Sequence, residues 1–150
     1  FLMACLRPEF SRRWIRVALI LSAMTFLGHA LYAIGFYTVP LNFKMMTQGL
    51  LGLSDKETIN LLLVAGWLDI GAAVGVFFLA TRIPSLIYMI FWGGVTALAR
   101  VASNFDRSAD FSGFDPWLVE TLVRTPHWLI PLLIIVLVKR GHVRMALARQ

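Results

Sequence analysis

The residues of this chain that are able to do chemistry lie within long apolar stretches. Asp69 is the only charged residue in the run LLLVAGWLDIGAAVGVFFLA, which extends from residue 61 to residue 80. A carboxylate is costly in a membrane, where it usually faces the helix bundle, has a polar partner and marks a ligand or proton path. Ala65, Gly66 and Ala73 share its helical face and would let another helix approach closely. Asp69 is therefore the first candidate for a functional residue.

Two other polar side chains are expected near the depth of Asp69. His29 lies about 12 Å from the outer end of its apolar segment and Asp69 about 15 Å from that of its own, at the rise of an α-helix. The side chain of Arg100 tilts toward the N-terminus of its helix and so into the membrane. We therefore predict that His29 and Arg100 hold Asp69. The predicted polar cluster comprises His29, Tyr32, Asp69, Trp92, Thr96, Arg100, Glu120, Arg124 and His127.

The predicted cluster is compatible with several roles. Glu120 and Arg124 stand four residues apart in the favourable order for a helical ion pair, at the outer end of the cluster. An ion pair between Asp69 and Arg100 would leave a ring nitrogen of His29 for a ligand or a proton path. The alternatives are a site for a small polar or quinone-sized ligand, polar contacts that only fix the order of the helices, and a protein-binding surface. No residue spacing typical of metal ligands occurs, so we predict no metal site, and no catalytic residue can be assigned.

The elements that must position these residues are membrane-spanning helices. The 150-residue chain is 59% hydrophobic and 15% charged, with a mean hydropathy of +0.75, whereas about 25% of residues are charged in soluble domains. A helix needs about 20 mostly apolar residues to cross a bilayer. The sequence predicts one all-α domain, residues 1–150, which is an integral membrane four-helix bundle with spans at residues 14–37, 59–81, 83–103 and 116–138. A start signal at Thr125-Pro126 predicts a break within the fourth span.

The first outer loop is expected to contain a helix of its own. Phe43, Met46 and Leu50 recur there near helical spacing. This pattern predicts a surface helix over Leu41–Leu51 with these three side chains toward the membrane. The sequence Ser54-Asp-Lys-Glu57 follows, which has the pattern of a capping box at the start of the second span.

The distribution of basic residues predicts the orientation. A tight inner turn is expected at Thr81–Pro84, on the same side of the membrane as the N-terminus. Nine basic residues fall on this side: Arg7, Arg12, Arg13, Arg16, Arg82, Lys139, Arg140, Arg144 and Arg149. Basic residues near span ends are enriched on the cytoplasmic side, so both termini are predicted to be cytoplasmic. The net charge of +6 is therefore explained by the membrane topology and by contact with a lipid bilayer. We predict no nucleic-acid partner. The single cysteine, Cys5, excludes an internal disulfide bond.

Four pieces of the sequence resemble the DoxX-like family of small four-span membrane proteins: Gly28-His29, Gly66–Asp69, Trp92–Arg100 and Glu120–Arg124, the last leading to Pro131-Leu. The resemblance implies a four-helix membrane bundle. Some members are linked to quinone-coupled sulfur oxidation or are subunits of membrane oxidoreductases. The resemblance thus implies a small integral subunit or accessory protein of such an enzyme, with other membrane protein subunits as partners and a quinone as a suitable ligand. The expected location is the bacterial plasma (inner) membrane.

Two other functions remain open from the residues themselves. One is a self-contained proton-linked transporter that uses His29 and Asp69. The other is a purely structural factor for membrane assembly. In each reading the chain is more a non-catalytic component than an enzyme by itself.

Overall fold

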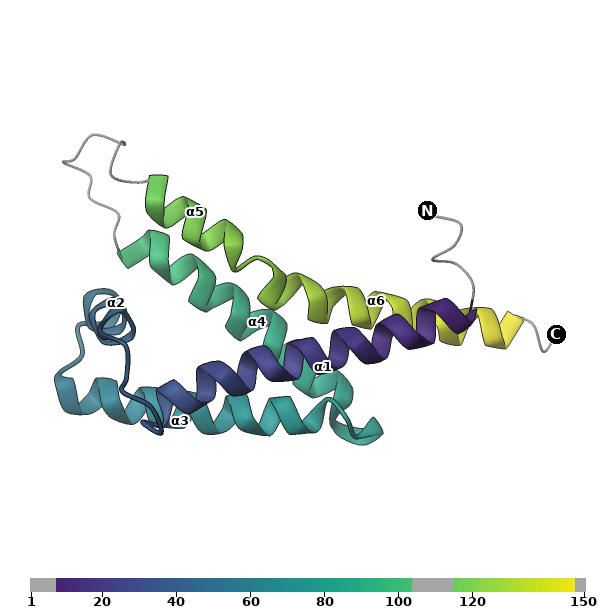
Figure 1. The fold of residues 1–150 in the computed structure, drawn as a ribbon, viewed down its shortest axis with the longest axis horizontal. Coiled ribbons are helices and arrows are strands. Elements are labelled where there is room, and N and C mark those ends of the chain that lie inside the picture. Colours follow the sequence, from purple (N-terminus) through teal and green to yellow (C-terminus); the bar gives the residue numbers. More distant parts are fainter. Residues whose placement is uncertain (1–7, 104–114, 148–150) are drawn as a thin grey trace.

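The computed structural model describes residues 8–103 and 115–147. These residues form six helices: α1 (Pro8–Ala33), α2 (Leu41–Leu51), α3 (Asp55–Gly75), α4 (Leu79–Ser103), α5 (Asp115–Val123) and α6 (Pro126–Leu147). Four long helical segments run along one common direction, and α2 lies across them, seen end-on in Figure 1. The predictions that concern Cys5, Arg7, Arg149 and the second outer loop fall outside the described residues.

Four helical segments are long and apolar enough to cross a membrane. They are Arg13–Ala33, Asp55–Gly75, Leu79–Ser103 and Pro116–Lys139, the last of which joins α5 to most of α6. The prediction of four helices that could span a membrane is confirmed, with the first two ending earlier than expected, and the described residues contain no strand. The start of α1 and the end of α6 lie at the same end of the molecule (Figure 1), as an even number of crossings requires.

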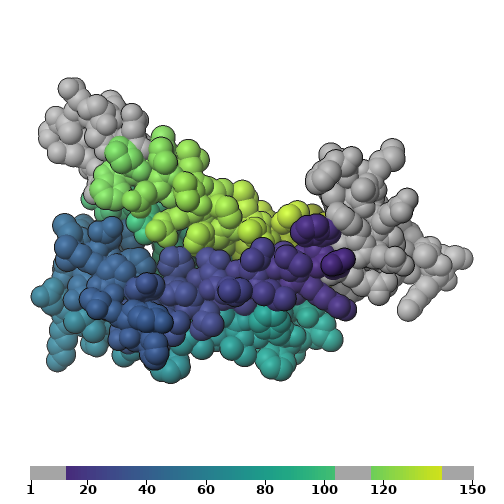
Figure 2. Space-filling view, in the orientation of Figure 1, coloured from purple at the N-terminus to yellow at the C-terminus, as the bar shows by residue number. Residues whose placement is uncertain are grey.

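The helices form a ring in which each long helix has two long neighbours. α1 packs against α3 and α6, and α4 packs against α3, α6 and α5. Figure 2 shows α1 and α6 side by side along one face of the molecule. α1 and α4 are therefore diagonal in the bundle. The predicted contact of Asp69 with both His29 and Arg100 assumes that the first three spans are mutual neighbours, which is correct for α1 with α3 and for α3 with α4 but not for the diagonal pair α1 and α4.

Small residues bring the long helices together and large ones cover the outside. A Cβ atom on Gly66 of α3 would lie 2.6 Å from Cγ2 of Ile34. One on Gly93 of α4 would lie 3.3 Å from the carbonyl group of His127 at the start of α6. The buried core comprises Leu19, Ala23, Phe26, Ala72, Ala73, Val76, Leu86, Met89 and Ile134. Large side chains such as Trp67 and Phe91 are exposed, as befits a surface solvated by lipid rather than by water.

The turn between α3 and α4 lies earlier in the chain than predicted. α3 ends at Gly75 and α4 begins at Leu79, so Thr81–Pro84 is helical and not the inner turn. The hydroxyl of Thr81 donates to the carbonyl of Gly75 at 2.8 Å, and Nε of Arg82 donates to that of Val76 at 3.0 Å. These polar residues thus cap the end of α3 from within the next helix, where the last carbonyls lack partners of their own.

The end of α1 is set by a glycine. The helix stops at Ala33, four residues before the predicted end of the span at Tyr37. Gly35 follows with a φ of +80°, the left-handed conformation that commonly ends a helix and that glycine adopts without a steric penalty. The backbone N–H of Tyr37 then returns to the carbonyl of Leu31 at 3.3 Å.

The helix of the first outer loop and its flanking cap are as predicted. α2 extends over Leu41–Leu51. The backbone N–H of Ser54 donates to Oε2 of Glu57 at 2.9 Å, and that of Glu57 donates to the Ser54 hydroxyl at 3.5 Å, which completes the capping box. α2 packs against α3 and α4.

The predicted break within the fourth span is also present, because α5 ends at Val123 and α6 begins at Pro126.

Candidate functional site

A cavity lies within the α2 end of the bundle, and we call it the apolar cavity. It has a volume of about 430 Å³ and is walled by α1, α2, α3, α4 and the start of α6. Its walls include seven members of the predicted cluster: His29, Asp69, Trp92, Thr96, Arg100, Arg124 and His127. The other walls are largely aliphatic and aromatic. A mostly apolar cavity with a few convergent polar groups is the usual form of a small-molecule site.

The apolar side of α2 faces this cavity. Phe43, Met46, Thr47 and Leu50 are among its lining residues. Phe43, Met46 and Leu50 therefore line a cavity of the protein, although Leu50 is also 40% exposed, and their predicted contact with the membrane stays a prediction. α2 crosses the ends of α3 and α4, so its apolar side covers the space between them.

A second cavity, which we call the polar cavity, adjoins the first. It has a volume of about 550 Å³ and shares five lining residues with the apolar cavity: His29, Phe43, Arg100, Arg124 and His127. It adds the two remaining members of the predicted cluster, Tyr32 and Glu120. The nine predicted residues thus line two adjoining cavities. Whether they bind a ligand stays a prediction.

Asp69 is held by residues of α4. Its side chain is buried, and its Oδ1 accepts a hydrogen bond from the Tyr88 hydroxyl at 2.8 Å. Trp92 lines the same cavity as Asp69, one helical turn after Tyr88. The rings of Tyr88 and Trp92 are nearly parallel, with planes 20° apart and centroids 6.5 Å apart. The aspartate in the apolar run is therefore held by the Tyr88 hydroxyl, and the Tyr88 ring is in turn stacked on Trp92.

The predicted partners of Asp69 are consequently wrong. His29 and Arg100 line the same cavity as Asp69, but each is bonded elsewhere. α1 and α4 are diagonal in the bundle and meet only in places, such as the rings of Phe26 and Tyr88, whose centroids are 6.4 Å apart. Sequence reasoning missed Tyr88, although it stands four residues before Trp92 on the same face of the helix. Extending the polar face of α4 by one turn would have found it.

His29 pairs with the histidine of the last span. The Nε2 atoms of His29 and His127 are 3.1 Å apart, and the ring centroids are 5.2 Å apart. One imidazole must donate and the other accept, so at least one of the two rings is neutral in this arrangement. The backbone of His127 comes this close because Gly93 has no side chain in its way. The contact lies on the wall that the two cavities share.

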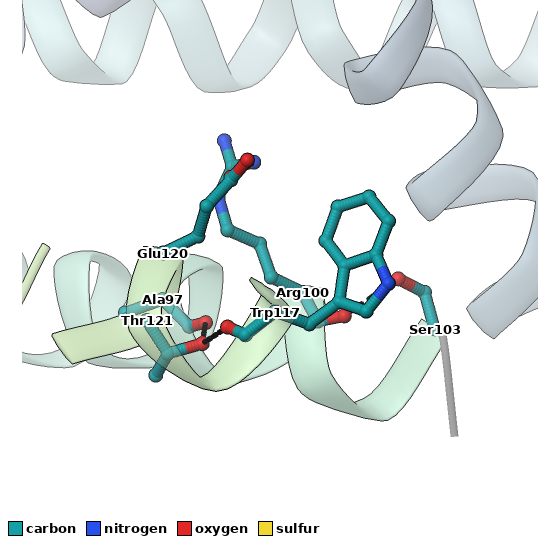
Figure 3. Close-up of polar contacts among 6 residues, drawn as sticks. All are labelled: Ala97, Arg100, Ser103, Trp117, Glu120 and Thr121. Carbon is teal, nitrogen blue, oxygen red and sulfur yellow. Dashed lines mark hydrogen bonds and ion pairs between the residues drawn. The ribbon is translucent and has the colours of Figure 1, made fainter. Parts of the chain in front are cut away.

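Arg100 pairs with the fifth helix. Its buried guanidinium group lies 2.7 Å from Oε2 of Glu120, and Figure 3 shows the two side chains pointing toward one another. The Thr121 hydroxyl is 3.0 Å from the carbonyl of Ala97 and joins α5 to α4 beside this pair. The predicted pair of Glu120 with Arg124 is corrected, because the carboxylate turns toward α4 instead.

Arg124 has a different environment. Its side chain is half-buried and lines both cavities. Within residues 13–103 and 116–139, whose side chains the structure describes, no hydrogen bond or ion pair of its guanidinium group is present. The same part of the chain contains no group of three or more His, Cys, Asp or Glu side chains able to hold a metal ion.

The remaining polar groups of the site are bonded locally. The Thr96 hydroxyl donates to the carbonyl of Trp92 at 2.9 Å, one turn earlier in α4. Tyr32 is 43% exposed, and its ring lies against Tyr37 with centroids 5.3 Å apart. The Thr96 hydroxyl is therefore used within its own helix, whereas Tyr32 contributes its side chain to the wall of the polar cavity. In comparisons with known proteins, the chain matches no family model, no curated protein and no solved structure.

Proposed function

We propose that this chain is a small integral membrane subunit or accessory protein of a membrane oxidoreductase, of the DoxX-like kind, and that it binds a quinone-sized ligand. The observation that carries the proposal is the apolar cavity. Its volume of about 430 Å³ falls within the range of about 300–1,000 Å³ typical of small-molecule sites. Its polar groups are few, and four of them, His29, Arg100, Arg124 and His127, lie on the wall that it shares with the polar cavity, which suits recognition of a polar head on an apolar molecule.

The residues of this wall suit the carbonyl groups of a quinone. A quinone offers hydrogen-bond acceptors, and the wall offers donors: the imidazoles of His29 and His127 and the guanidinium group of Arg124. Trp92 and Phe43 supply aromatic faces on either side. A bound quinone would supply two-electron redox chemistry. The chain would hold its head group, exclude water through α2 and leave catalysis to a partner subunit.

The resemblance to the DoxX-like family supports the same reading. Each of its four pieces contains a residue that lines one of the two cavities: His29, Asp69, Trp92 with Arg100, and Glu120 with Arg124. The location that we propose is the bacterial plasma membrane with both termini in the cytoplasm, on the basis of the basic residues near the span ends.

The test begins with the protein purified in a mild neutral detergent. Organic extraction should yield quinone in amounts comparable to the protein, and a short-chain quinone should quench tryptophan fluorescence with saturation. Ala99→Phe fills the cavity, since Ala99 lines it, and should weaken the titration by at least about tenfold. The matched control is Leu98→Phe, because Leu98 is 66% exposed on the outside of the same helix. If the quinone quenches the fluorescence of the two variants with equal apparent affinity, the cavity does not bind the quinone.

A proton-linked carrier is the second candidate. The observation that favours it is the position of the His29–His127 contact, on the wall between the two cavities. Opening this contact would join the cavities into one passage toward Asp69. The isolated protein in liposomes should then move protons together with a solute, and His29→Ala should abolish that movement. A subunit of a redox complex would show no such transport.

A further inference from the structure

Arg124 stands out among the charged groups of the polar cavity. The other cation of that cavity, Arg100, forms its ion pair with Glu120 at 2.7 Å. Among the lining residues that the structure describes, Glu120 is the only acidic one, and its charge balances that of Arg100. Arg124 is left as the remaining full charge. Its guanidinium group has five N–H donors in a planar fork, the geometry that matches a carboxylate or a phosphate.

The groups around Arg124 are donors as well. Tyr32 and Asn42 line the polar cavity with a hydroxyl and an amide group. The His29 and His127 imidazoles lie on the wall that it shares with the apolar cavity. Hydrogen bonds to charged groups are stronger than neutral ones. A half-buried cation surrounded by neutral donors, with its neighbouring carboxylate already engaged, is an environment that favours an anion.

We propose that the polar cavity is an oxyanion site, in which Arg124 binds a carboxylate or phosphate group with help from the surrounding donors. This site shares His29, Arg124 and His127 with the proposed quinone site, but the binding of an acid does not depend on a redox function. Two sources can supply the group. One is a small free anion, and the other is the head of an acidic lipid whose chain enters the adjoining apolar cavity past His29 and His127.

The experiment compares acids with a neutral ligand of the same shape. The full chain is purified in a neutral detergent, and its thermal unfolding is followed by tryptophan fluorescence with increasing ligand, since a ligand that binds only the folded state raises the midpoint. The probes are a long-chain fatty acid, its methyl ester, acetate and inorganic phosphate. Stabilisation by the fatty acid but not by its ester or by the small anions supports the proposal with a lipid source. Stabilisation by acetate or phosphate supports it with a free anion.

Variants show whether the effect comes from Arg124. Arg124→Gln should weaken the apparent affinity for the stabilising acid by about tenfold or more, the least expected from a lost hydrogen bond to a charged group. The apparent affinity of Arg124→Lys should lie between those of the wild type and Arg124→Gln, because lysine keeps the charge and loses the planar fork. The control is Lys139→Gln, which removes an exposed charge about 20 Å along the helix from the site.

Two results would overturn the proposal. The first is equal stabilisation by the fatty acid and its methyl ester together with no effect of acetate or phosphate, which needs no variant and so holds even if a variant fails to fold. The second is an unchanged affinity in Arg124→Gln. The quinone titration is unaffected by either result, so the failure of one proposal is distinguishable from the failure of the other.

Discussion

The Nε2 atoms of His29 and His127 lie 3.1 Å apart and join the first span to the last. This hydrogen bond predicts a coupling between two residues that are far apart in the sequence. In a double-mutant cycle, His29→Ala and His127→Ala should be non-additive in the free energy of unfolding by about 0.5–1.5 kcal/mol, the net worth of such a bond. Unfolding by denaturant in detergent micelles measures it. His29→Ala combined with Val136→Ala should be additive, and additivity of the histidine pair would mean that the contact is absent.

The Tyr88 hydroxyl is predicted to stabilise the fold through Asp69. Tyr88→Phe keeps the ring and removes the donor at 2.8 Å from Oδ1, which leaves a buried carboxyl oxygen without that partner. The expected loss is about 1–3 kcal/mol in the free energy of unfolding. Asp69→Asn should cost less than Asp69→Ala, since the amide keeps hydrogen bonding. If Tyr88→Phe is as costly in the Asp69→Ala background as in wild type, the hydroxyl stabilises the fold through another group.

The Arg100–Glu120 pair is predicted to hold α5 on α4. Glu120→Ala leaves the buried guanidinium group without the carboxylate at 2.7 Å. Glu120 is 45% exposed, so water screens part of the effect, and we expect a loss of about 1.5–3 kcal/mol, the range for hydrogen bonds to charged groups. Lys56→Ala, a change at an exposed residue of α3, is the control. Equal stabilities of the two variants would show that the pair contributes nothing measurable.

Gly66 is predicted to be required for the contact between α1 and α3. Gly66→Ala would bring a Cβ atom to 2.6 Å from Cγ2 of Ile34, so the helices must separate and the protein should be destabilised. Gly71→Ala is the matched control, because nothing lies within 4 Å of its added Cβ atom. Alanine there should be neutral or stabilise by up to about 1 kcal/mol through helix propensity. Thermal midpoints in one detergent compare the two, and equal shifts would argue against close packing at Gly66.

The orientation of the chain is open to a direct test. We predict that a reporter active only in the cytoplasm is active when fused after Gln150, since the basic residues near the span ends lie on the side of the termini. A fusion within the loop before α2, at Thr38, should be inactive. A well-expressed fusion after Gln150 that stays silent would reverse the predicted topology.

The sequence alone was sufficient for the features that depend on neighbouring residues. Four helices that could span a membrane, the helix over Leu41–Leu51, the capping box at Ser54 and the break before Pro126 all appear where the pattern predicted them, although the first two of the four end earlier than expected. Each of them arises from the length of an apolar run, from helical spacing or from a cap within a few residues. The turn at Thr81–Pro84 was misplaced because its polar residues cap the previous helix from inside the next one.

The tertiary structure alone decided which polar groups meet. Helical faces correctly indicated the polar residues that line the two cavities, since a polar group in a membrane turns away from lipid. Their partners depend on the order of the helices around the bundle, which no local pattern contains. With α1 diagonal to α4, His29 meets His127, Arg100 meets Glu120, and Asp69 is left to Tyr88. Hydrogen bonds act over about 3 Å, so a change of neighbours changes every partner while the residues that face inward stay the same.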